Sequence, residues 1–93
     1  MDKINEHNEL CTLLHEIYKS KNSAYGDSFG KSFDEWGIPA AAIRITDKYN
    51  RFVNLGKHPE IDDGDEKITD TLIDMANYCL MTVMELRRKD GND

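Results

Sequence analysis

The sequence lacks the features of a secreted, disulfide-bonded or membrane-embedded protein. It has only two cysteines among 93 residues, Cys11 and Cys79, and they do not form a CxxC pair. Both lie on apolar helical faces, so we expect them to be small buried side chains. No segment approaches the roughly 18 apolar residues of a membrane helix, and the opening MDKINEHNEL has no apolar signal-peptide run. These absences predict a cytoplasmic protein with no membrane partner.

Positive charge is also scarce. Twelve Lys and Arg residues face eighteen Asp and Glu residues, and the net charge is −6. A chain of this sign is repelled by phosphate backbones and anionic lipids, so we expect no duplex nucleic acid partner, although a local basic site is compatible with it. Because a chain of this length buries only a modest fraction of its surface, we predict a single domain, 1–93, that forms a homo-oligomer, either a dimer or a tetramer.

Apolar residues recur at helical spacing in three long segments. The segments are 4–21, 38–55 with Pro39 in its first turn and Gly56 after it, and 66–89. The fold class predicted is all-α, an antiparallel bundle of three main helices with a core of 4–89 and a frayed tail, 90–93. The predicted inward residues are Leu10, Leu13, Leu14, Ile17 and Tyr18 in the first segment and Ala42, Ile45, Tyr49 and Phe52 in the second.

The segment 66–89 organises the predicted bundle, because it is apolar on two sides and should therefore be covered on two sides. A polar stripe interrupts it, formed by Asp70, Asp74 and Asn77 at i, i+4 and i+7. Carboxylates inside a buried helix are costly unless a cation, a metal or water compensates them. The run Asp63-Gly64-Asp65-Glu66 fits a capping box before this helix. The two apolar rows are Ile68, Leu72, Met75, Cys79, Val83 and Leu86, and Ile73, Leu80 and Met84.

The segment 22–37 replaces aliphatic periodicity with glycines, serines and four aromatic residues, Tyr25, Phe29, Phe33 and Trp36. We expect a structured connection in which Gly26 and Gly30 supply backbone freedom and the aromatic rings fold over the helices. The polar groups of Lys21 and Asn22 beside the Tyr25 ring suit a flat heteroaromatic ligand. A lid that only closes the core would have the same composition.

The second segment presents a basic face with one acid in it. A short loop to the third segment makes the two helices antiparallel and can bring this face toward the polar stripe. Either the two faces pair as internal salt bridges, or the acids hold a divalent cation while the basic side chains bind phosphate. Charge alone does not choose between these two arrangements. The face consists of Arg44, Asp47, Lys48 and Arg51.

Three blocks in the chain, KNSAYGDSFG (21–30), IRITDKYNR (43–51) and DTLIDMANY (70–78), resemble a small phage and prophage family called the nucleotide-modification-associated domain. That family is similar to the all-α nucleoside triphosphate pyrophosphatases, the MazG-like and dimeric dUTPase group. The resemblance implies a MazG-like helical bundle, a nucleotide ligand, magnesium as cofactor, and the host cytoplasm as location if a phage encodes the chain. Asp74 matches the last acid of the ExxD motif of those enzymes.

The acids depart from the enzyme pattern. Thr71 stands where the ExxD motif has its glutamate, and Asp70, one position earlier, is the possible replacement. On the preceding helix, where the enzymes have three acids, this chain has only Asp47. Because magnesium hydrolases cluster carboxylates, we expect nucleotide binding between the second and third helices. The alternatives are a magnesium-dependent pyrophosphohydrolase and a non-catalytic helical scaffold. The predicted ligand-binding residues are Lys21, Asn22, Tyr25, Arg44, Lys48, Arg51 and Asn77, and the predicted magnesium ligands are Asp47, Asp70 and Asp74.

Overall fold

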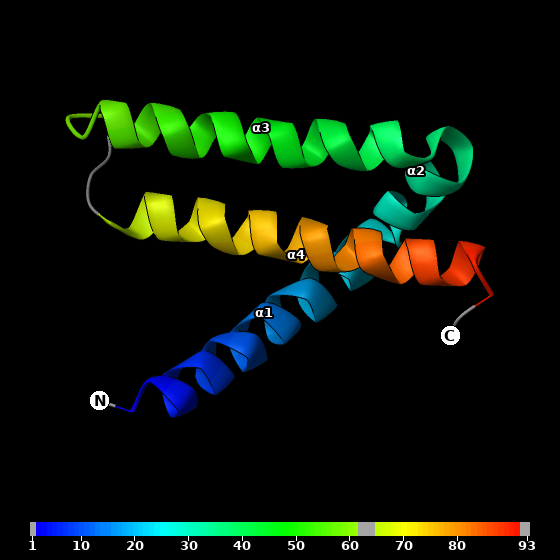
Figure 1. Cartoon of the computed structure of the whole chain (residues 1–93), viewed down its shortest axis with the longest axis horizontal. Helices are drawn as coiled ribbons and strands as arrows, with labels where there is room; N and C mark the ends of the chain where they lie inside the picture. The colour runs from blue at the N-terminus through cyan, green and yellow to red at the C-terminus, as the bar shows by residue number, and fades with distance from the viewer. Residues whose placement is uncertain (1, 62–64, 92–93) are drawn as a thin grey trace.

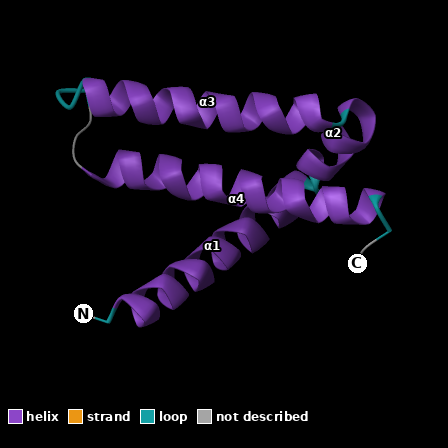
Figure 2. Cartoon of the chain, viewed as in Figure 1, coloured by secondary structure: helices purple, strands orange, loops and turns teal. Residues whose placement is uncertain are grey.

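The computed structural model describes residues 2–61 and 65–91, which form four helices and no strand. The helices α3 and α4 lie side by side and antiparallel, α2 turns at one end of this pair, and α1 crosses α4 and then diverges from it (Figure 1, Figure 2). The all-α prediction is therefore confirmed, and the structure adds a short fourth helix to the three main helices expected. The helices are α1, Lys3–Tyr25, α2, Ser28–Trp36, α3, Ile38–Lys57, and α4, Asp65–Lys89.

The predicted connection 22–37 is mostly helical. Its first residues extend α1, which ends at Gly26 with φ 60° and a backbone N–H that donates to the Asn22 carbonyl. Its remainder forms α2, because Phe29 and Phe33 stand at i, i+4 and bury one face of a short helix. Gly30 lies inside α2. Its small size matters there rather than its backbone freedom, since a Cβ at this position would lie 2.5 Å from Oδ2 of Asp27.

The inward face of α3 is shifted from the predicted stripe and shares with it only Ile45 and Phe52, which are half-buried. Ala41 and Leu55 are buried, whereas Ala42 and Tyr49, which we expected in the core, are exposed. The shift turns Lys48 toward α4, where its side chain finds an acidic partner. A pattern based on apolar residues alone cannot detect a face that includes a paired lysine.

The core lies where α2 packs against α3 and α4. Phe29, Phe33 and Ala41 form the buried cluster, and Tyr78 and Met81 of α4 pack against it. The ring centroids of Phe29 and Phe33 are 6.3 Å apart, and those of Phe29 and Tyr78 are 5.8 Å apart. The prediction that aromatic rings fold over the helices is confirmed for these two phenylalanines and is wrong for Tyr25 and Trp36, which are exposed.

The expectation that α4 is covered on two sides is wrong for the described chain. Much of its first apolar row is exposed, α1 has no buried residue, and both cysteines are exposed. The cause is the path of α1, which meets α4 only near its own C-terminal half and leaves the rest of both faces open (Figure 1). The exposed members of the row are Leu72, Cys79, Val83 and Leu86.

The two ends of α4 agree in part with the ends predicted from the sequence. The helix begins at Asp65, and the whole of the predicted capping box, 63–66, lies outside the residues whose side chains the structure describes. At the other end, the backbone N–H groups of Asp90 and Gly91 donate to the carbonyls of Leu86 and Arg88, while 92–93 of the predicted tail lie outside the described residues. No described helix is long and apolar enough to cross a membrane.

Replacing Phe33 by Ala should destabilise the protein strongly, because this ring is only 2% exposed and its removal leaves a cavity in a small core. We expect a loss of about 3–5 kcal/mol in the free energy of unfolding, measured by urea denaturation. Phe33→Leu provides a milder variant should the Ala variant fail to fold. The control is Trp36→Ala in the same helix, where the side chain is 67% exposed. Equal losses in Phe33→Ala and Trp36→Ala would contradict the placement of the core.

Candidate functional site

The central feature of the candidate site is a carboxylate held between two lysines. Oδ1 of Asp74 in α4 lies 3.0 Å from Nζ of Lys21 in α1, and its Oδ2 lies 3.2 Å from Nζ of Lys48 in α3. One negative charge between two positive charges leaves the group with a net positive charge. The two ion pairs join three helices at one point, and of the basic face predicted on α3 only Lys48 takes part in them.

The electrostatics of Asp74 follow from these partners. Burial alone would raise the pKa of the carboxyl, but the hydrogen bonds and positive charges of Lys21 and Lys48 outweigh burial and hold the pKa below its usual value. The side chain is therefore ionised at neutral pH, as both ion pairs require.

Two buried polar side chains on α4 flank the group. The Asn77 amide donates to the backbone carbonyl of Leu14 at 3.1 Å, so it attaches α4 to α1. The Thr71 hydroxyl donates to the Lys67 carbonyl at 2.8 Å and accepts from Nε of Arg51 at 3.0 Å. Both contacts satisfy groups that would be costly to bury alone.

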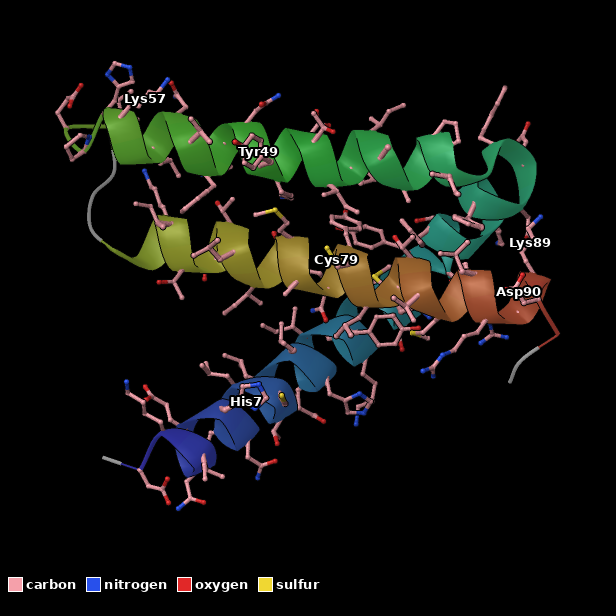
Figure 3. All side chains as sticks on the ribbon, viewed as in Figure 1. His7, Tyr49, Lys57, Cys79, Lys89 and Asp90 are labelled. Carbon is pink, nitrogen blue, oxygen red and sulfur yellow. The ribbon has the colours of Figure 1, made fainter. Side chains whose placement is uncertain are left out.

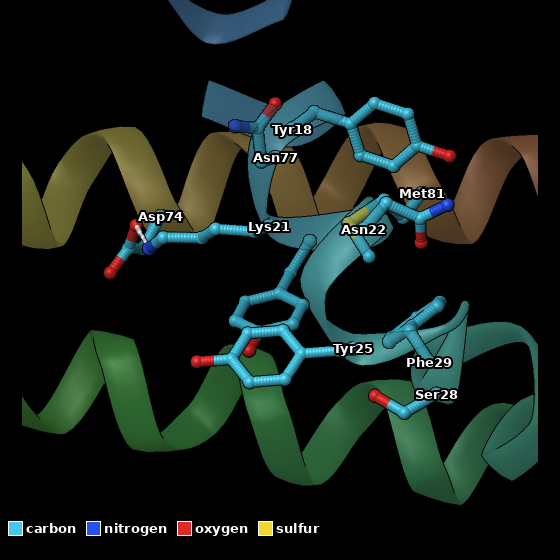
Figure 4. A pocket seen from close by; sticks show the side chains of 10 residues that line it. Tyr18, Lys21, Asn22, Tyr25, Ser28, Phe29, Asp74, Asn77 and Met81 are labelled. Atoms are coloured by element: carbon cyan, nitrogen blue, oxygen red, sulfur yellow. Dashed lines mark hydrogen bonds and ion pairs between the residues drawn. The ribbon is translucent and has the colours of Figure 1, made fainter. Parts of the chain in front are cut away.

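A pocket opens beside this group. It has a cavity volume of about 80 Å³ and opens to solvent. Figure 4 shows Lys21 reaching Asp74, with Tyr25 and Phe29 on the side that faces α3 in this view. The walls combine aromatic rings with one ammonium group and two amides. The lining residues are Tyr18, Lys21, Asn22, Tyr25, Ser28, Phe29, Asp74, Asn77, Tyr78 and Met81.

The structure brings together about half of the predicted site. Five of the predicted residues line the pocket, and Lys48 joins them through Asp74. Arg44, Asp47 and Asp70 are exposed and do not line it, and Arg51 contacts Thr71 instead. The pocket is formed by α1, α2 and α4, and not by the two long antiparallel helices between which we expected it. The five residues are Lys21, Asn22, Tyr25, Asp74 and Asn77.

Several lining residues are absent from the predicted site. The sequence pattern places Tyr18 and Met81 on apolar faces and gives Phe29 a covering role. They line the pocket because α1 continues past Lys21 and crosses α4, which brings its last turns over the middle of that helix. The aromatic and polar mixture of 21–30 is the signal that could have located the pocket.

The predicted magnesium ligands, Asp47, Asp70 and Asp74, do not form one group in the structure. Among the residues whose side chains the structure describes, no group of three or more His, Cys, Asp or Glu is placed to hold a metal ion. Asp47 and Asp70 are exposed on different helices, and both oxygens of Asp74 contact ammonium groups. These residues do not fit the expected three-carboxylate site, and magnesium stays a prediction.

Comparison with known families gives one match. The family model described as nucleotide modification associated domain 1 matches residues 21–86, which is more than half of the chain. The matched region begins at Lys21 and includes every lining residue of the pocket except Tyr18. Comparisons with curated proteins and with solved structures give no match.

Asp74→Asn should reduce stability at neutral pH, because the variant loses both ion pairs. We expect a loss of about 1 kcal/mol at pH 7, measured by urea denaturation. Since folding lowers the pKa of Asp74, its contribution is present above the unfolded value of about 4 and disappears as pH falls through the lower folded pKa. The control is Asp70→Asn, an exposed acid of the same helix. Equal stability of the two variants at pH 7, or a difference that does not shrink in acid, would contradict this role of Asp74.

Proposed function

Because the chain belongs to the nucleotide modification associated domain 1 family, we propose that it binds a nucleotide in the pocket between α1, α2 and α4. The observation that carries this proposal is the placement of an exposed ammonium group, Lys21, beside aromatic rings and amides in one pocket. A nucleotide needs the same combination, a cation for its phosphate and a flat apolar surface with hydrogen-bonding groups for its base.

Lys21 is the proposed phosphate-binding residue. Its side chain is 56% exposed although it contacts Asp74. An ammonium group has three N–H donors, so one can stay on the carboxylate while the others meet a phosphate oxygen. Lys48 holds the opposite oxygen of Asp74 and adds a second positive charge nearby. The net positive charge of the three groups favours an anionic ligand.

The base would lie against the aromatic wall. Tyr25 presents an exposed ring at the pocket, and Phe29 and Tyr78 supply further apolar surface. Aromatic rings stack on nucleobases irrespective of their identity, and the Asn22 amide can both donate to and accept from a base edge. The pocket has a cavity volume of about 80 Å³, which is below the usual range of small-molecule pockets, so most of the nucleotide would lie in its open mouth.

The proposal is binding without hydrolysis. A metal ion at Asp74 would have to displace two ammonium groups from its oxygens and would then be repelled by them. Hydrolases of the all-α pyrophosphatase group, which the sequence resembles, place several carboxylates around magnesium instead. We therefore propose a nucleotide-binding relative of that group, and no observation on the described residues favours the pyrophosphohydrolase alternative.

The test is a panel of nucleoside mono-, di- and triphosphates, each with and without magnesium, measured by thermal unfolding and by titration calorimetry. At least one nucleotide should stabilise the wild-type protein and be recovered unchanged. Lys21→Gln should weaken its binding about tenfold or more, equivalent to roughly 1.4 kcal/mol, because the phosphate loses its cation. Lys19→Gln removes a charge from the same helix at an exposed position and should bind like the wild type.

Three results would count against the proposal. The absence of a response to every nucleotide would favour the scaffold alternative. Equal affinities of the Lys21→Gln and Lys19→Gln variants would show that the phosphate lies elsewhere. Release of pyrophosphate would show that the chain is an enzyme and not only a binding protein.

A further inference from the structure

An apolar groove runs between α1 and α4. It has a volume of about 350 Å³, and its walls include Cys11 and Leu14 of α1 and Leu80 of α4. Further aliphatic side chains of α4 are exposed outside the groove. We call the groove together with the exposed aliphatic side chains of α4 the α1–α4 apolar face. Those side chains are Leu72, Leu80, Val83 and Leu86.

The area of the molecule shows that the chain leaves more surface exposed than a compact monomer of its size. The chain exposes 6998 Å², whereas a folded monomer of 10.7 kDa is expected to expose about 5,500 Å². Its radius of gyration is 14.9 Å, against about 12 Å for a compact domain of this length. The excess of roughly 1,500 Å² exceeds the 800 Å² or so that each partner buries in a stable interface.

We infer that a second copy of this chain covers the α1–α4 apolar face in a homodimer. The described core contains only four buried hydrophobic residues, and so few contribute little against the conformational entropy lost in folding. If a partner is needed for stability, it must be present whenever the chain folds, and another copy of the chain meets this condition. In a two-fold dimer the face packs against its own copy, which adds a second hydrophobic core between the α1 and α4 helices of both subunits.

The first half of α1 supports this assignment. No other helix of the chain faces it in Figure 1, and Figure 3 shows His7 there, far from the labelled residues of α3 and α4. An isolated helical segment of this length is marginal in water. Packing against a second subunit supplies the tertiary contact that this segment lacks within its own chain.

The proposed interface borders the proposed nucleotide pocket. Tyr18, Asn77 and Met81 line both the groove and the pocket. A second copy in the groove would therefore support the wall of the pocket from behind. The inference itself depends on the apolar face and would stand without a nucleotide ligand.

Sedimentation equilibrium of the full chain at micromolar concentrations tests the inference. The wild type should have twice the monomer mass of 10.7 kDa. Leu80→Glu should have the monomer mass, because it places a charge in the groove at a side chain that is 53% exposed within one chain. Ile43→Glu makes the same type of change at an exposed position on α3 and should stay dimeric. A monomeric wild type, or a dimeric Leu80→Glu variant, would overturn the inference.

A second measurement does not require the dimer to be broken by mutation. Cys11 lines the groove and is exposed in the single chain. In a Cys79→Ser variant, alkylation of Cys11 should become at least several-fold slower as protein concentration is raised through the range where the dimer forms. A rate independent of concentration, together with a dimeric mass, would place the interface on another face and overturn the inference.

Discussion

The ion pairs between Asp74 and two lysines are the interaction on which the site depends. Lys21, Lys48 and Asp74 come from three helices, and the carboxylate orients both ammonium groups. Because Asp74 is partly buried, the two ammonium groups compensate the loss of hydration of its charge. The same pairing that holds α1 against the α3–α4 pair leaves a net positive charge at the pocket, so the stability of this region and the proposed preference for an anion have one origin.

Aromatic residues give the site its second component. The rings that form the core between α2, α3 and α4 continue directly into the wall of the pocket, where Phe29 belongs to both. A core so small cannot be changed without moving the pocket. The family match over residues 21–86 covers this unit except Tyr18 and leaves out most of α1.

The helical class and the approximate ends of α3 and α4 could be predicted from apolar spacing, because a period of 3.6 residues sustained over several turns is typical of a helix with one buried face. The residues of the site were harder to predict from the sequence. Arg44 and Arg51 resemble phosphate-binding residues in the sequence, yet the rotation of α3 turns Lys48 inward instead. Glycines at 26 and 30 indicated a connection, but only Gly26 ends a helix. Such outcomes depend on helix rotation and crossing, which spacing within one segment does not determine.

The central claim is that a nucleotide binds between α1, α2 and α4 beside Lys21. Amide chemical shifts of isotope-labelled protein, recorded by NMR during titration with a nucleotide that stabilises it, test this most directly. Binding at this pocket predicts that the largest changes fall on 18–29 and 74–81. Changes centred on the exposed face around Arg44 and Asp47 of α3, with the residues near Lys21 unaffected, would contradict it.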